Sequence, residues 1–166
     1  ILVGPGLVQD YQLPVSDLPP TVIDAGGLEW GIRLKGDAVL TPHPGEMARL
    51  TGLTVQKIQS DRIHIAKSYA KKWGKIIVLK GANTVITSPD GNIMVSPFAN
   101  PALATAGTGD VLAGVIAGFL AQGIDCFSAA CVGVYIHGLA GEQISLASDL
   151  LSVLPKIIRN LIYIPE

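Results

Sequence analysis

A glycine-rich turn with an aspartate stands directly before an apolar helical pattern, in the run Ala106-Gly107-Thr108-Gly109-Asp110. The glycines would let backbone N–H groups approach an anion, and the positive end of the following helix dipole would favour that anion. The carboxylate of Asp110 could then accept a proton from a hydroxyl group beside a bound phosphate. The structural alternative is a turn with a helix-capping aspartate, which is worth about 1 kcal/mol of stability and carries no chemistry.

A histidine and a glutamate follow an apolar run in Leu40-Thr41-Pro42-His43-Pro44-Gly45-Glu46. Open α/β sheets bind their ligands at the carboxyl ends of strands. His43 could therefore contact a ligand, and Glu46 a metal-bound water. The alternative is that Glu46 caps a short helix and that His43 is an exposed loop residue.

Two further loops follow predicted strands. Lys80-Gly81-Ala82-Asn83-Thr84 offers a cation for a phosphate and a glycine for close backbone approach, and Gly4-Pro5-Gly6 offers a second glycine loop. Each loop also fits an ordinary turn. Asp24 ends another strand, where a carboxylate is well placed to touch a ligand. Because all these segments follow strands or precede a helix, we expect them to meet at one edge of a sheet.

The elements that must position these residues alternate between short apolar runs and helical patterns. The predicted strands are residues 1–3, 21–24, 38–41 and 76–80, followed by a hairpin of 84–88 and 92–95 around Pro89-Asp90-Gly91. The predicted helices are residues 27–34, 54–73, 110–122, 126–145 and 148–162, with an irregular segment at 97–109. This order predicts an α/β fold with a mainly parallel sheet flanked by helices and a C-terminal run of three helices.

The helices carry expectations of their own. Thr54 is the predicted N-cap of the long helix, and Gly74 its predicted end. Pro155 is expected to kink or break the last helix. His137 is expected to be a hydrogen-bonded core histidine, and His64 a solvated one. One face of the helix at 110–122 carries small residues that are expected to pack closely against a neighbour: Ala113, Gly114, Ala117 and Gly118.

Composition excludes several classes of protein. The 166 residues suffice for one domain, and a net charge of −1 with 5% aromatic residues gives no footprint for nucleic acid. The longest unbroken apolar stretch, Val111 to Ala121, has 11 residues, whereas a membrane span takes about 20. Cys126 and Cys131 fit neither a zinc site nor a disulfide framework and are expected to pack in the core.

Three segments, in this order and spacing, resemble the ADP/ATP-dependent NAD(P)H-hydrate dehydratases of the ribokinase-like superfamily. They are LTPHPGEMARLTG, VLKGANTVITSPDG and NPALATAGTGDVLAGVIAGFLAQG, and the tail segments YIHGLAGE and ASDLLSVLPKIIR also match the family pattern. Sugar kinases of the superfamily usually carry asparagine where His43 stands, and thiazole and pyrimidine kinases usually carry cysteine where Asp110 stands. The resemblance covers nearly the whole chain. It implies a single ribokinase-like domain, residues 1–166, without the strands and helices that normally precede the Gly-Pro-Gly loop.

The resemblance implies a repair reaction. NADH or NADPH that has added water across its nicotinamide ring would be dehydrated back to the working cofactor, driven by ADP or ATP with Mg²⁺. Phosphorylation would turn the ring hydroxyl into a good leaving group, and elimination would follow. The expected partners are the hydrated dinucleotide, NAD(P)HX, further copies of the chain, and an NAD(P)HX epimerase domain or protein. Neither nucleic acid nor a membrane is expected, and the expected location is the cytoplasm, or an organelle if a targeting segment precedes Ile1.

The family positions map onto individual residues of this sequence. Asp110 would be the catalytic base, beside an anion hole formed by the backbone amides of Gly107, Thr108 and Gly109. The nucleotide would contact Lys80, Gly81, Ala82, Asn83, Thr84 and Gly109. The hydrated dinucleotide would contact Gly6, His43 and Asp110. Glu46 would help to place Mg²⁺ through water.

Two positions depart from the family pattern, and two other functions fit the same residues. Val8 replaces the last glycine of GPGLG, and Glu29 replaces the asparagine of DADALN. A kinase of a small alcohol, such as a vitamin precursor, would use the same base and anion hole but would release a stable phosphoester. A nucleotide-binding module without catalysis would bind ADP without turnover.

Overall fold

The computed structural model describes residues 1–7, 18–144 and 146–162. A single sheet has six strands in the order of the sequence: β1 (Leu2–Val3), β2 (Thr21–Ile23), β3 (Ala38–Leu40), β4 (Ile76–Leu79), β5 (Val85–Thr87) and β6 (Ile93–Val95). Strands β1 to β4 pair in parallel, and β5 and β6 pair antiparallel as a hairpin. The predicted hairpin is therefore confirmed, with Val85 opposite Val95.

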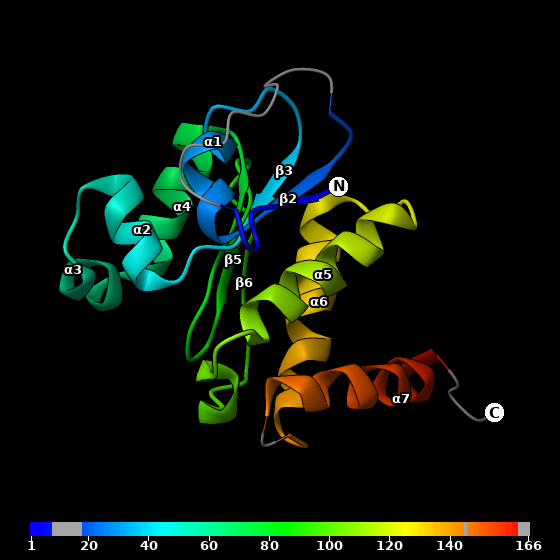
Figure 1. Ribbon diagram of the computed structural model, residues 1–166. Coiled ribbons are helices and arrows are strands. Elements are labelled where there is room, and N and C mark those ends of the chain that lie inside the picture. Colours follow the sequence, from blue (N-terminus) through cyan, green and yellow to red (C-terminus); the bar gives the residue numbers. More distant parts are fainter. Residues whose placement is uncertain (8–17, 145, 163–166) are drawn as a thin grey trace.

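Helices cover both faces of the sheet (Figure 1). On one face lie α1 (Leu28–Gly31), α2 (Pro44–Thr51), α3 (Val55–Ser60) and α4 (Arg62–Trp73). On the other face lie α5 (Thr108–Ala121) and α6 (Cys126–Gly141), and α7 (Leu150–Ile162) packs across α6. Short 3₁₀ turns occur at Ala25–Gly27, Pro101–Ala104 and Ala147–Asp149. The predicted α/β class, with three C-terminal helices, is confirmed.

The side chains of β4 show why the strands are apolar on both faces. Ile77 and Leu79 pack with Met47 and Ala66 in a core beneath α2 and α4. Ile76 and Val78 point the other way, into a core formed with α5 and α6. Successive side chains of a strand alternate between faces, so a sheet covered on both sides needs apolar residues at every position.

The single helix predicted for residues 54–73 is two helices in the structure. Asp61, with φ −150° and ψ 52°, ends α3 and precedes α4. The predicted ends are confirmed: the Thr54 hydroxyl accepts a hydrogen bond from the Lys57 amide at 3.2 Å, and Gly74 has a left-handed φ of 64°. The sequence gives no sign of the break, because the buried residues Ile58 in α3 and Ile65 in α4 keep a helical spacing across Asp61.

Other helix boundaries also differ from the expectations. Helix α5 begins at Thr108 rather than Asp110, and α6 ends at Gly141, short of Ser145, which lies outside the described residues. Helix α7 continues through Pro155. Packing accounts for this continuity, because Leu150, Leu154 and Ile157 bury the same side of α7 against α6, and this burial offsets the hydrogen bond that proline cannot make.

Both predicted core cysteines are partly buried free thiols that pack against the core between the sheet and α5–α6. Burial raises the pKa of each thiol, Cys126 and Cys131, to about 11. Both therefore stay protonated and inert at neutral pH.

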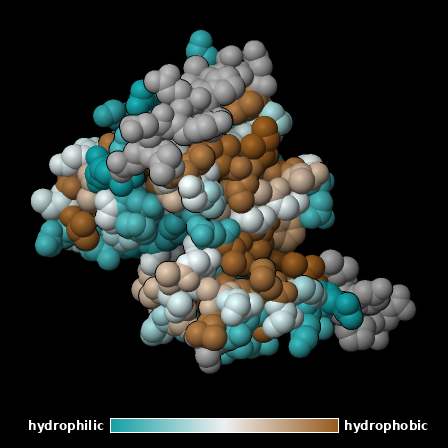
Figure 2. Space-filling model, in the orientation of Figure 1, coloured by the Kyte–Doolittle hydropathy of each residue, from teal (hydrophilic) through white to brown (hydrophobic). Residues whose placement is uncertain are grey.

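None of the helices in the described part of the chain has the length and apolar character needed to cross a membrane. In the orientation of Figure 2, the surface over α2 and α3 is largely hydrophilic and the surface over α5 and α6 is more hydrophobic. Large apolar side chains are exposed along the edge strand β6 and on the adjoining helix α6, at Ile93, Met94, Val95, Val132 and Tyr135. The expected homo-oligomer stays a prediction.

The prediction that the small residues of α5 pack closely against a neighbour is wrong in part. Gly114 and Gly118 are exposed, and a Cβ placed on either would have no described atom within 4 Å. The close contact between α5 and α6 comes instead from Gly133 on α6, where a Cβ would lie 2.7 Å from Ile116 Cγ1. Ile116 is fully buried, so it has no room to move away.

Substitution of the buried and of the exposed glycine by alanine should change the stability of the protein in opposite directions. Gly133→Ala should destabilise the protein by about 1–3 kcal/mol, because the added methyl overpacks a closed helix contact. The matched control, Gly114→Ala, should stabilise it by about 0.5–1 kcal/mol, because alanine loses less chain entropy in a helix. Urea denaturation of both variants checks the prediction, and equal effects would contradict the α5–α6 packing.

Candidate active site

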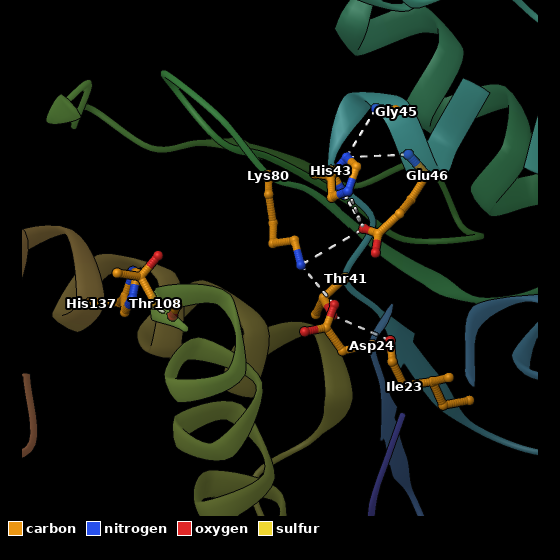
Figure 3. A network of polar contacts seen from close by, with 9 residues as sticks. All are labelled: Ile23, Asp24, Thr41, His43, Gly45, Glu46, Lys80, Thr108 and His137. Atoms are coloured by element: carbon orange, nitrogen blue, oxygen red, sulfur yellow. Dashed lines mark hydrogen bonds and ion pairs between the residues drawn. The ribbon is translucent and has the colours of Figure 1, made fainter. Parts of the chain in front are cut away.

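Polar side chains from neighbouring strand ends meet at one edge of the sheet (Figure 3). Lys80 follows β4, and its Nζ atom lies 2.7 Å from Asp24 Oδ1, at the end of β2. The same Nζ lies 3.9 Å from Glu46 Oε2, in the first turn of α2. The expectation that these segments gather at one sheet edge is confirmed.

The Lys80–Asp24 pair is shielded from water. The Asp24 side chain is 2% exposed and the Lys80 side chain 17% exposed. Removing one member of a buried ion pair leaves an unpaired charge and typically destabilises a protein by about 3–5 kcal/mol. The pair therefore fixes the position of the Lys80 ammonium group while leaving part of it exposed.

His43 and Glu46 form a reciprocal cap on α2. His43 Nδ1 accepts hydrogen bonds from the amides of Gly45 and Glu46, and Glu46 Oε2 accepts one from the His43 amide at 2.7 Å. Pro44 occupies the first helical position, where its missing N–H costs nothing. The structural alternative for these two residues is thus realised, and the exposed His43 ring still borders the same edge of the sheet.

The Gly-Pro-Gly loop packs onto the end of β2. Gly4 has φ +123°, and a Cβ there would lie 1.7 Å from the carbonyl oxygen of Asp24, so glycine is required. Gly6 is exposed, also with positive φ, and is free to face a ligand. Val8 lies outside the described residues. The other departure, Glu29, makes a surface ion pair of 3.2 Å with Arg49.

The N-terminus of α5 lies against the buried ion pair. A Cβ on Gly109 would lie 3.2 Å from Lys80 Nζ and 3.9 Å from Asp24 Oδ2. The Thr108 amide donates to the Thr105 carbonyl at 3.3 Å, so it is already engaged. Among the described residues, neither the Gly107 nor the Gly109 amide has a hydrogen-bond partner. Asp110 is the third helical residue and its side chain is exposed.

A cavity of about 290 Å³ opens between the Lys80–Thr84 loop and the start of α5. Six of the predicted nucleotide or anion-hole residues line it: Lys80, Gly81, Ala82, Thr84, Thr108 and Gly109. Asn83 does not line it, because its side-chain amide donates to the Ser96 carbonyl at 3.1 Å. The cavity walls also do not include Gly6, His43, Glu46, Gly107 or Asp110. The structure therefore separates this cavity from an outer group of residues along the sheet edge.

Sequence reasoning missed several walls of this cavity. Phe98 and Asn100 line it from the segment expected to be irregular, and His137 lines it from α6. The prediction that His137 is a hydrogen-bonded core residue is confirmed, with Nε2 2.9 Å from the Thr108 carbonyl oxygen. No pattern in the sequence places residues of α6 opposite the Lys80 loop, because that proximity arises from the packing of α5 on α6.

The protonation state of His137 follows from its surroundings. A carbonyl oxygen only accepts, so Nε2 carries the hydrogen that is donated to Thr108. Burial lowers the pKa of His137 to about 4, against the opposing effect of the Thr108 bond. The neutral ring thus fixes the first residue of α5 at neutral pH.

This shift predicts an acid-sensitive stability. Between pH 6.5 and about 4 the unfolded chain binds a proton at His137 that the folded chain does not. The free energy of unfolding should therefore fall as the pH falls through that window, by up to about 3 kcal/mol. His137→Gln keeps a donor for Thr108 but does not titrate, so its stability should fall less. Urea titrations of both proteins at about pH 7, 6 and 5 check this, and parallel curves would contradict it.

Comparisons with known proteins agree with this geometry. The model of a family described as NAD(P)H-hydrate dehydratase matches residues 1–163. A bifunctional NAD(P)H-hydrate repair enzyme from Moorella thermoacetica is 46% identical, over 97% of this chain and 34% of that protein. An ADP-dependent (S)-NAD(P)H-hydrate dehydratase from Bacillus subtilis is 38% identical, over 95% of this chain and 63% of that protein. The chain thus spans about a third of the first relative and under two thirds of the second.

Solved structures show the same fold. The ADP/ATP-dependent NAD(P)H-hydrate dehydratase of Bacillus subtilis, co-crystallised with ATP/Mg²⁺ and soaked with CoA, superposes with a TM-score of 0.85 and 38% identity, over 96% of this chain and 65% of that one. Phosphofructokinase-2 from Escherichia coli, at 16% identity and a TM-score of 0.54, shares the fold alone. The match over nearly all of the sequence, together with the loops gathered at the sheet edge, shows that the chain belongs to the NAD(P)H-hydrate dehydratase family.

Proposed function

We propose that this chain carries the nucleotide-dependent dehydration of hydrated NADH or NADPH, a carbon–oxygen lyase reaction of metabolite repair. One observation carries the proposal: the start of α5, with Asp110 in its first turn, abuts the Lys80 ammonium group at the mouth of a 290 Å³ cavity. The helix N-terminus favours a phosphate at this position, and the carboxylate in its first turn is available to accept the proton of an attacking hydroxyl. The Bacillus subtilis relative named as an ADP-dependent (S)-NAD(P)H-hydrate dehydratase supports the same reaction.

The chemistry needs two bond exchanges. The ring hydroxyl oxygen forms a bond to the terminal phosphorus of ADP or ATP, and the bond from that phosphorus to the bridging oxygen breaks. The C–O bond of the new phosphoester then breaks, phosphate leaves with the electron pair, and loss of a proton from the adjacent ring carbon forms the C=C bond. The products are the repaired dinucleotide, phosphate and the shortened nucleotide.

The residues divide this work between them. Asp110, in the first turn of α5, accepts the hydroxyl proton. The amides of Gly107 and Gly109 face the transferring phosphoryl group, and glycine at 109 lets the backbone approach Lys80. Thr108, whose amide is engaged, contributes by fixing the turn. The nucleotide occupies the cavity beside the Lys80–Thr84 loop, while Gly6 and His43 meet the hydrated dinucleotide at the outer edge.

Magnesium fits this arrangement only through the nucleotide. Within residues 1–7, 18–144 and 146–162, no group of three or more His, Cys, Asp or Glu side chains could hold a metal ion. Glu46 Oε2 already accepts a hydrogen bond from the His43 amide. We therefore assign this carboxylate to a metal-bound water rather than to the metal itself. Mg²⁺ usually keeps several waters and binds through substrate phosphates, where it would neutralise charge during phosphoryl transfer.

The proposed location and partners rest on the same family. We propose a cytoplasmic location, or an organellar one where the natural chain has a targeting segment ahead of Ile1. We propose an NAD(P)HX epimerase domain or protein as the chain's partner, and the word bifunctional in the names of two relatives supports a second activity beside this one. We also propose that the chain self-associates and that its reaction uses either ADP or ATP.

The proposed function predicts the behaviour of one substitution. The complete natural protein, supplied with hydrated NADH, Mg²⁺ and either ADP or ATP, should restore the absorbance of reduced nicotinamide. Asp110→Asn should lower kcat by about 10²- to 10⁴-fold with little change in nucleotide binding, because only the proton acceptor is lost. The matched control is Asp125→Asn at the start of α6, where asparagine caps the helix equally well and activity should persist.

The products distinguish the other functions. Accumulation of a stable phosphoester from a small alcohol, with no recovery of NADH, would identify a kinase. Binding of ADP without turnover of any substrate would identify a nucleotide-binding module. Either result would overturn the dehydratase.

A further inference from the structure

Arg62 contacts the backbone of the Lys80–Thr84 loop from outside the cavity. At the start of α4, its Nη2 atom donates to the carbonyl oxygens of Leu79 at 2.8 Å and of Lys80 at 3.3 Å. Its Nη1 atom donates to Gln59 Oε1 at 2.8 Å. Arg62 does not line the cavity of about 290 Å³ but a separate hollow on which Asn83 also lies. It therefore acts on the backbone that carries Lys80 without touching the space for the nucleotide.

The loop that Arg62 supports has an unusual backbone. Gly81 has φ +135°, and Asn83 has φ +52°, a left-handed conformation that non-glycine residues rarely adopt. The Asn83 end is fixed by its amide donating to the Phe98 carbonyl at 2.9 Å. At the Lys80 end, the Lys80 amide donates to the Pro42 carbonyl at 2.9 Å, and the side-chain bonds come from Arg62. Such a backbone persists only where its surroundings hold it.

The charge of Arg62 is not neutralised locally. Within the part of the chain that the structure describes, no carboxylate lies within ion-pair distance of its guanidinium, whereas Lys80 is paired with Asp24. Arg62 Nε is buried without a hydrogen-bond partner among the same residues. Burial lowers the pKa of the guanidinium, which still stays charged at neutral pH. A Cβ on Gly81 would lie 3.1 Å from Arg62 Nη1, so this cation is directly beside the loop.

We propose that Arg62 is a positioning residue for the nucleotide: it clamps the carbonyls of Leu79 and Lys80, so that the Lys80–Thr84 loop keeps the form in which it meets the phosphates. This role rests on the proposed function only in that the loop binds ADP or ATP. The break between α3 and α4 at Asp61 is what brings Arg62 to the end of β4. The guanidinium fork matches two neighbouring carbonyls, which a single ammonium group cannot do equally well.

The test compares nucleotide binding in three variants of the complete natural protein. Arg62→Met keeps the apolar stem and removes the clamp, and Arg62→Lys keeps the charge and loses the fork. Arg49→Met removes a surface arginine whose ion pair is with Glu29 rather than with the loop. Calorimetry measures the Kd of ADP with Mg²⁺, and steady-state kinetics give the KM of hydrated NADH separately.

Positioning predicts a selective effect. Arg62→Met should raise the Kd of ADP by about 10- to 100-fold, the range expected for losing hydrogen bonds from a charged donor. The KM of hydrated NADH should change by less than about 3-fold, Arg62→Lys should recover part of the loss, and Arg49→Met should bind ADP as the unaltered protein does. If Arg62→Met does not fold, Arg62→Lys carries the test, with an expected rise in Kd of about 3- to 10-fold.

Other results would overturn the proposal. These are an unchanged Kd of ADP in a folded Arg62 variant, or an equal loss of affinity for nucleotide and hydrated NADH with a lowered Tm, which would mean a purely structural role. The proposed function fails separately: if the unaltered protein binds ADP but restores no NADH, the dehydratase is wrong while the ratio of Kd values still decides the role of Arg62. Absence of any ADP binding by the unaltered protein would overturn both.

Discussion

The contact on which the site depends is the buried ion pair between Lys80 and Asp24. It ties the end of β4 to the end of β2 across β3, which lies between them in the sheet. Asp24 is almost completely buried, so leaving its charge unpaired would cost much stability. The ion pair therefore holds the otherwise flexible Lys80 side chain in one position. The close approach of Gly4 to the Asp24 carbonyl and of Gly109 to Lys80 then follows, since any larger residue at either position would push the pair apart.

This arrangement is the reason why the proposed phosphate site must draw on backbone groups. With Lys80 neutralised by Asp24 and close to a second carboxylate, Glu46, the net charge of the three side chains is negative. The attraction for an anion must therefore draw on the α5 dipole, on amides at its first turn and on cations outside the trio. Helix α5 can supply its dipole and its amides only by approaching the pair closely, which is the reason for glycine at position 109. Glycine at position 107 is explained instead by its left-handed φ of 91°.

Much of this could be predicted from the sequence, and the reason lies in the strands. Parallel strands covered on both faces must be apolar throughout, so their ends are marked by the first polar or glycine residue, such as Asp24, Thr41 and Lys80. The edge at which they meet follows from topology alone. The break at Asp61 was not predictable, because neither proline nor glycine marks it and the apolar stripe runs on across it. Nor could the sequence show that Phe98 and His137 face the Lys80 loop, since that depends on how α6 packs against the sheet.

The neutral state of His137 completes the account of how the anion site is fixed. Thr108 is held through its amide, through its hydroxyl, which donates to the Leu103 carbonyl at 2.7 Å, and through its carbonyl, which accepts from His137. The turn is thus organised before any ligand arrives, and no reorganisation is needed when charge develops on a phosphoryl group. A protonated imidazole would add a positive charge here, but burial disfavours it at neutral pH. His137 therefore contributes geometry rather than charge to this site, and the electrostatic attraction comes from the helix terminus and from the cations near the Lys80 loop.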